Sequence, residues 1–265
     1  MPTAKIPEKR TPLARVASKA TTAVERALRL YGQLVTVYPD AHCELEHLSP
    51  FQLLVATVLS AQTTDVAVNK VTPELFRRYP NAAALGQAPL VEVETLIGSI
   101  GMYRQKAKHI IGLSQKLVLY HKGEVPSRLS DLVALPGVGR KTANVVLGVA
   151  FGTPEGVVVD THVQRLAQRL GFTRETEPES IERALMTLFP KSEWDRISHT
   201  LIFHGRRCCS ARSPVCADCP VVGDCPSAHR AEEIGRKSAK PRAASKSRAL
   251  IAKPAVTGVI TRRKP

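Results

Sequence analysis

The chain has 265 residues, of which 43% are hydrophobic, and a formal net charge of +15. This length and composition allow one large or two modest globular domains, and they include no apolar run suited to a membrane span or a secretory signal. Most of the positive charge lies in residues 1–22 and 236–265, and the part between them is close to neutral. The net charge alone therefore does not establish a nucleic-acid partner.

Both ends of the chain carry few large apolar side chains. We expect residues 1–22 and 230–265 to be disordered basic tails. Two interpretations remain open for them, a solvated tail and a segment that adds diffuse attraction to phosphate.

The central part of the chain has the apolar spacing of helices. The stripe from Val24 to Val35 follows the i, i+3, i+4, i+7 pattern of an amphipathic helix. Phe51–Ala61 is apolar almost all round, as a buried central helix would be, and residues 103–121 and 129–135 give further helical segments. The one extended stretch, Val157–Val159, is too short for a sheet, so an all-α fold is predicted.

The segment LPGVGRKTA predicts two helices joined by a tight turn. One helix ends at Pro136, Gly137, Val138 and Gly139 turn the chain, and the next helix starts at Lys141. Two glycines permit positive φ and leave the new helix start open, so its N–H groups can face a phosphate oxygen. A plain connection between two helices explains the same pattern equally well.

Lys141 and Asp160 are candidates for chemistry. Lys141 is expected in the first helical turn, where the helix dipole disfavours a cation, and this suits a nucleophilic amine. Asp160 ends the run GVVVD and precedes an apolar stripe that closes at Gly171, so it is a natural helix N-cap. An exposed phosphate-binding lysine and a purely capping aspartate are the alternative interpretations.

Four cysteines close to the C-terminal end have the spacing C-x6-C-x2-C-x5-C. Four thiolates in so short a segment indicate a metal site, and this spacing leaves zinc and an iron-sulfur cluster both open. Cys208 is adjacent to the first of the four and is interpreted as a bystander, although a swap between the two neighbours stays open. The four cysteines are Cys209, Cys216, Cys219 and Cys225.

Taken in order, LPGVGRKTANVVL, VDTH and the cysteine spacing resemble the endonuclease III family of bifunctional DNA glycosylases, in the helix-hairpin-helix, Gly/Pro-Asp superfamily. SPFQLLVATVLSAQTTDVAVNK and IGSIGMYRQKAKHI extend the resemblance, which covers roughly residues 24–229. It implies two helical domains flanking a DNA-binding cleft. Residues 43–153 would form a six-helix barrel with the helix-hairpin-helix, and residues 23–42 and 154–229 a domain that carries a [4Fe-4S] cluster.

The resemblance also implies roles for single residues. Lys141 matches the Schiff-base lysine and Asp160 the catalytic aspartate, while Gln62 would fill the gap left by a flipped nucleotide. Met102 lies where the family commonly has a leucine wedge, and Ser60 and Asp65 would lie near the damaged base. The remaining expected DNA contacts are Gly137, Val138, Gly139, Arg140, Thr142 and His162, and the expected cluster ligands are Cys209, Cys216, Cys219 and Cys225.

The resemblance predicts a base-excision-repair glycosylase that removes oxidised pyrimidines from duplex DNA and cleaves abasic sites by β-elimination. The alternatives are a monofunctional adenine-mismatch glycosylase and a non-catalytic helix-hairpin-helix DNA-binding protein. The first needs a glutamate on the helix before Gln62, where this chain has Ala56, Thr57 and Val58, and retention of Lys141 and Asp160 argues against the second. A monomer in the cytoplasm, associated with the nucleoid through DNA, is expected.

Overall fold

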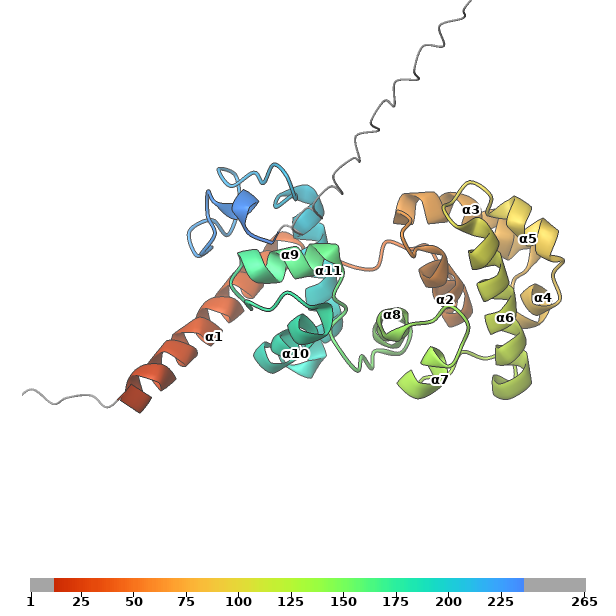
Figure 1. Ribbon diagram of the computed structural model, residues 1–265, viewed down its shortest axis with the longest axis horizontal. Coiled ribbons are helices and arrows are strands. Elements are labelled where there is room, and N and C mark those ends of the chain that lie inside the picture. The colour runs from red at the N-terminus through yellow and green to blue at the C-terminus, as the bar shows by residue number, and fades with distance from the viewer. Residues whose placement is uncertain (1–11, 236–265) are drawn as a thin grey trace, which may run out of the picture.

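The computed structural model describes the backbone of residues 12–235 and the side chains of residues 23–235. All regular elements in this range are helices, as the apolar spacing predicts, and none of them is long and apolar enough to cross a lipid bilayer. Figure 1 shows them in two lobes. One lobe holds α2 (Pro50–Leu59), α3 (Asp65–Arg78), α4 (Ala82–Gly86), α5 (Leu90–Leu96), α6 (Tyr103–His121), α7 (Leu129–Val133) and α8 (Arg140–Phe151). The other holds α1 (Pro12–Val37), α9 (Thr161–Arg169), α10 (Pro178–Leu188), α11 (Trp194–Arg207) and the short 3-10 helices η1 (Lys191–Glu193) and η2 (Ala231–Glu233).

The lobe of α2 to α8 is built around α2. Ser49 caps this helix by accepting a hydrogen bond from Gln52 N, and Pro50 occupies the first turn, where its missing N–H costs nothing. Leu53 through Leu59 are buried, so α2 is covered on every side. Its neighbours contribute Val68, Leu113 and Leu147, among others, to one continuous apolar core.

The other lobe has a separate apolar core. Leu30 and Leu34 of α1 pack there with Val163 and Leu166 of α9 and with residues of α10 and α11. The chain passes between the two lobes twice, before α2 and again between α8 and α9. The division into domains at residues 43–153, with 23–42 and 154–229 as the second domain, stays a proposal, and the two separate cores support it.

The structure corrects the expected tail boundaries at both ends. α1 begins at Pro12, so residues 12–22 continue the helix, because this segment is rich in good helix formers such as Ala, Leu, Arg and Lys and has no glycine. Near the other end, Ala231 is buried in the core of its lobe, and Ile234 O accepts a hydrogen bond from Arg169 Nε at 2.9 Å. Residues 230–235 are therefore part of the folded lobe, whereas residues 1–11 and 236–265 lie outside the described range.

Candidate active site

The turn between α7 and α8 presents the start of α8. Gly137 has φ +76°, and a Cβ there would meet His109 Nδ1 at 2.8 Å, so both the backbone and the space require glycine. Gly139 differs from the expectation, because its φ of −93° is open to any residue. It is the N-cap of α8, and a Cβ at this position would have no neighbour within 4 Å, so Gly139 leaves the N–H groups of the first turn open rather than providing positive φ.

Asp160 is the N-cap of α9, as its position in the sequence predicts. Its Oδ1 accepts a hydrogen bond from Val163 N at 2.7 Å, which fixes the direction of the carboxylate. The extended segment that leads to it is held in turn, because Val158 N donates to Ser198 Oγ of α11 at 3.1 Å. α8 packs against α11 as well, so the helix that carries Lys141 and the loop that carries Asp160 share one support.

A cavity of about 270 Å³ brings the two candidates together. Lys141 of α8 and Asp160, which directly precedes α9, both line it. The chain crosses from one lobe to the other between these two residues. Residues after α2 line the same cavity. The predicted residues that the cavity includes are Lys141, Asp160, Gln62, Thr142, Ser60 and Asp65.

The cavity also contains residues that the sequence did not indicate. Arg206 of α11 donates from Nη2 to Asp65 Oδ2 at 2.7 Å and from Nη1 to Glu44, so it joins α11 to two segments of the other lobe. His42, Cys43 and His199 complete this part of the lining. Arg206 lies three residues before Cys209, but nothing in that spacing distinguishes it from an exposed arginine beside it, such as Arg207.

Two of the carboxylates that line the cavity, those of Asp65 and Asp160, lie close enough to affect each other. Burial, followed by the charge of Asp160, raises the pKa of Asp65 above its ordinary value. His162 of α9 is half-buried, and burial lowers the pKa of its imidazole. The site therefore combines an amine, a fixed carboxylate and a second, less acidic carboxyl group around one cavity.

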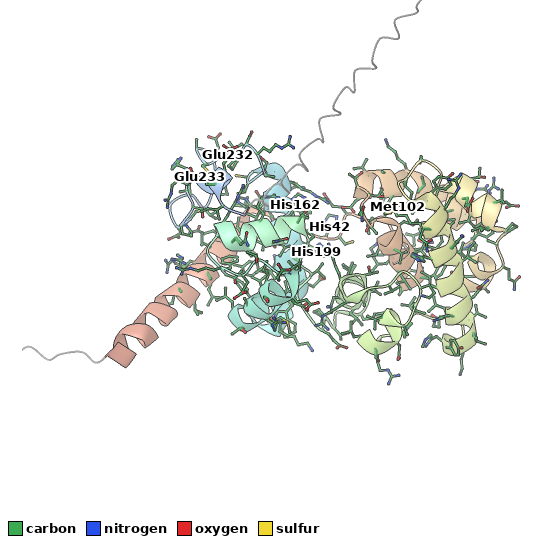
Figure 2. The ribbon with its side chains drawn as sticks, in the orientation of Figure 1. His42, Met102, His162, His199, Glu232 and Glu233 are labelled. Carbon is green, nitrogen blue, oxygen red and sulfur yellow. The ribbon has the colours of Figure 1, made fainter. Side chains whose placement is uncertain are left out.

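Gln62 and Met102, the two expected gap-filling residues, share an unusual backbone conformation. Their φ values are 54° and 56°, in the left-handed region that residues other than glycine rarely adopt. Strain of this kind persists where the surrounding structure imposes it and is common at functional sites. Met102 is 53% exposed and lies outside the cavity lining, on the lobe opposite His42, His162 and His199 (Figure 2).

Two of the other expected DNA contacts have partners within the protein. Arg140 forms a bidentate ion pair with Glu182 of α10, with Nη2 to Oε1 at 2.9 Å, and so links the hairpin to the opposite lobe. His162 Nδ1 lies 3.2 Å from Arg165 Nη2, which also donates to the carbonyls of Gly205 and Cys209. The cavity lining does not include Gly137, Val138, Gly139, Arg140 or His162.

The cysteine segment follows α11 and packs against α9. Arg169, which is fully buried, donates to Cys209 Sγ at 3.3 Å and to the carbonyls of Ser210 and Ala211. All four spaced cysteines are free thiols. Thiolates on one zinc ion would lie about 3.8 Å apart, because a Zn–S bond is about 2.3 Å.

The donor set does not have that single-ion arrangement. Among the described residues, the group of three potential ligands within 4.8 Å of one another is His204, Cys208 and Cys219, and not three of the spaced cysteines. Burial, followed by the charge of Cys219, raises the pKa of Cys208 to about 12, and burial also raises the pKa values of Cys209 and Cys225. The Sγ of Cys208 donates to Val215 O. The four spaced cysteines are therefore compatible with an iron-sulfur centre, in which each thiolate binds a different iron.

Comparison with known proteins connects this site to a family. Residues 55–191 match the family described as HhH-GPD superfamily base excision DNA repair protein. The chain is 53% identical over 201 residues to endonuclease III of Synechocystis sp., covering 76% of this chain and 92% of that protein. It is 50% identical over 184 residues to endonuclease III of Bacillus subtilis, covering 69% and 84% of the two chains.

Solved structures give the same result. A trapped covalent intermediate of endonuclease III with DNA, in an estranged-adenine complex, superposes with a TM-score of 0.74 at 45% identity and covers 79% of this chain and 97% of that one. A non-covalent endonuclease III–DNA complex matches equally well. A thermostable thymine-DNA glycosylase, with a TM-score of 0.69 at 23% identity, shares the fold.

Proposed function

Because the chain belongs to the HhH-GPD superfamily of base excision DNA repair proteins, and within it to the endonuclease III family, we propose that Lys141 and Asp160 perform its chemistry. The protein is a DNA glycosylase with AP lyase activity that acts on oxidised pyrimidines in duplex DNA. The observation that carries the assignment of residues is that Lys141 and Asp160 line one cavity at the crossing between the lobes.

The first task of the site is to take the damaged nucleotide out of the duplex. A base inside the stack cannot reach the cavity, so the nucleotide has to be flipped. The open start of α8 is suited to hold a phosphate beside the lesion. Gln62 and Met102 would enter the space that the flipped nucleotide leaves, and their left-handed backbone conformations fix the direction in which each side chain leaves the main chain.

In the second task the Lys141 Nζ attacks C1′ of the sugar. A C1′–N bond to the lysine forms, the glycosidic bond breaks, and the base leaves with the bonding electrons and takes up a proton. Asp160, held by the N–H of Val163, stabilises the positive charge that builds on the sugar. Opening of the sugar ring gives an imine, which acidifies the C2′ proton, and loss of that proton expels the 3′ phosphate.

The cysteine segment is proposed to hold a [4Fe-4S] cluster through Cys209, Cys216, Cys219 and Cys225. The cluster would supply a structural centre that fixes the loop after α11. Arg169 would orient the first ligand through its bond to Cys209 Sγ, and it would hold the loop through the two following carbonyls. Cys43 lines the cavity beside Lys141 and Asp160 and is not proposed as a cluster ligand.

Reductive trapping tests the assignment of the nucleophile. Borohydride reduces the imine to a stable amine, so the wild-type protein is expected to form a covalent adduct with a duplex that contains an abasic site or an oxidised pyrimidine. Lys141→Ala should abolish the adduct, and Lys70→Ala, which removes an exposed lysine of α3, should leave it unchanged. An adduct that forms in Lys141→Ala at the wild-type rate would assign the nucleophile to another amine.

A further inference from the structure

His204 of α11 lies between a tyrosine and one of the proposed cluster ligands. Its side chain is buried, with 1% of its surface exposed. The Nδ1 atom lies 3.1 Å from Tyr38 Oη, and the Nε2 atom lies 3.8 Å from Cys219 Sγ, within hydrogen-bonding range of sulfur. Tyr38, directly after α1, is itself buried and Cys219 is partly buried, so the Tyr38–His204 contact is shielded from solvent.

The chemistry of a ligating cysteine determines which nitrogen of His204 carries the proton. A thiolate has no hydrogen and accepts only, so Nε2 has to be the N–H donor toward Cys219. In the neutral imidazole Nδ1 is then the acceptor, and the Tyr38 hydroxyl donates to it. Each of the three groups has one consistent role when Cys219 is a thiolate.

Packing holds this chain of three groups in place. The ring of Tyr38 meets Phe203 edge-on, with centroids 6.4 Å apart, and the Arg207 guanidinium lies 4.2 Å from the centroid of Phe203. The Tyr38 hydroxyl therefore faces His204 in a fixed direction. Metal sites commonly fix a histidine in the same way, because a hydrogen bond to the second ring nitrogen orients the imidazole.

We propose that His204, with its tautomer fixed by Tyr38, donates a hydrogen bond to the Cys219 thiolate and raises the reduction potential of the cluster. The inference rests on the proposed [4Fe-4S] cofactor. An N–H directed at a ligating sulfur stabilises negative charge, and the reduced cluster carries one negative charge more than the oxidised cluster. The hydrogen bond therefore favours the reduced state. Arg169 plays the corresponding part at Cys209, at 3.3 Å.

Voltammetry of the cluster-loaded protein tests this proposal, with iron content measured on each preparation. His204→Leu removes the donor and should shift the potential to a lower value. His204→Gln offers an amide N–H in place of the imidazole N–H, so its potential should stay close to that of the wild-type protein. Tyr38→Phe removes only the hydroxyl, so the imidazole can take the other tautomer, and the potential should fall by less than in His204→Leu.

Tyr31→Phe is the matched control, because Tyr31 is another buried tyrosine of α1 whose hydroxyl donates to Glu193, away from the cysteines. It should keep the wild-type potential. If His204→Leu does not retain iron, Tyr38→Phe decides the matter. A full complement of iron with an unchanged potential in Tyr38→Phe, and in His204→Leu where it loads, would overturn this inference and leave the cofactor assignment intact. Iron-free wild-type protein, prepared anaerobically with iron supplied, would overturn both.

Discussion

At the scale of single residues, Asp160 has two functions that require the same carboxylate. Its Oδ1 caps α9 through Val163 N, and the residue also lines the cavity with Lys141. The cap keeps the carboxylate in one direction, which an acid-base or charge-stabilising group needs. Capping alone would be served nearly as well by asparagine, which also accepts a hydrogen bond from a helix N–H.

Asp160→Asn therefore separates the two functions. The variant keeps the cap but loses the negative charge and the basic oxygen, so single-turnover excision of an oxidised pyrimidine should fall by about a hundredfold or more. Melting temperature and affinity for duplex DNA should change little. Near-normal excision would leave Asp160 as a cap only and would direct attention to Asp65, another carboxyl group of the cavity.

At the scale of elements, α6 connects the two expected gap-filling residues. Its residue Lys106 is only 3% exposed, and burial lowers the pKa of its amine. Lys106 N donates to Met102 O at 3.1 Å, and Lys106 Nζ donates to Thr63 Oγ1 at 2.6 Å, next to Gln62. One buried lysine thus contacts the segments of both Gln62 and Met102, and burying its charge costs stability that an apolar side chain would not.

We expect Lys106→Met to leave the melting temperature unchanged or higher, because an apolar side chain of similar length replaces a buried charge. Excision of an oxidised pyrimidine from duplex DNA should fall by about tenfold, because the variant loses the hydrogen bond from Lys106 Nζ to Thr63 and a bond to a charged group is worth about that much. Lys116→Met is the control, since Lys116 is an exposed lysine of the same helix whose Nζ bonds Ala134 O. A lower melting temperature with normal excision would show that Lys106 only supports the fold.

The elements show what sequence can predict and why. The starts of α8 and α9 follow from local signals, the turn at Gly137 and the cap at Asp160, and the structure has both. The start of α1 was predicted too late because low apolar content says nothing about helix propensity. The role of Lys106 depends on a contact with Thr63, 43 residues away, and no local pattern encodes such a contact.

At the scale of the whole molecule, the cavity is assembled from segments that are far apart in the chain. Its predicted residues lie within or near the recognisable motifs around Gln62, Lys141 and Asp160. Arg206 and Glu44 were missed, because they are separated by 162 positions and meet only once the two lobes are in place. Their ion pair and that of Arg140 with Glu182 both join the lobes, so the geometry of the site depends on how the lobes sit together.

The distribution of charge over the molecule gives a prediction for residues 236–265, which lie outside the described range. This segment has ten Lys and Arg residues and no acid, whereas the part of the chain between the two ends is close to neutral. Each phosphate that a cation neutralises releases counterions, so the slope of log affinity against log salt reports the number of such contacts. Deleting residues 236–265 should lower the affinity for undamaged duplex DNA and make this slope less steep.

Single-turnover excision at saturating protein should stay unchanged in the truncated protein, because Lys141, Asp160 and the rest of the cavity are all retained. Deleting residues 1–11 is the control, since it removes three basic residues and one acid and should have a much smaller effect on the slope. An unchanged salt slope after deletion of residues 236–265 would mean that the segment does not contact phosphate. DNA affinity would then have to come from the two lobes themselves, where the open start of α8 offers its N–H groups to a phosphate beside Lys141.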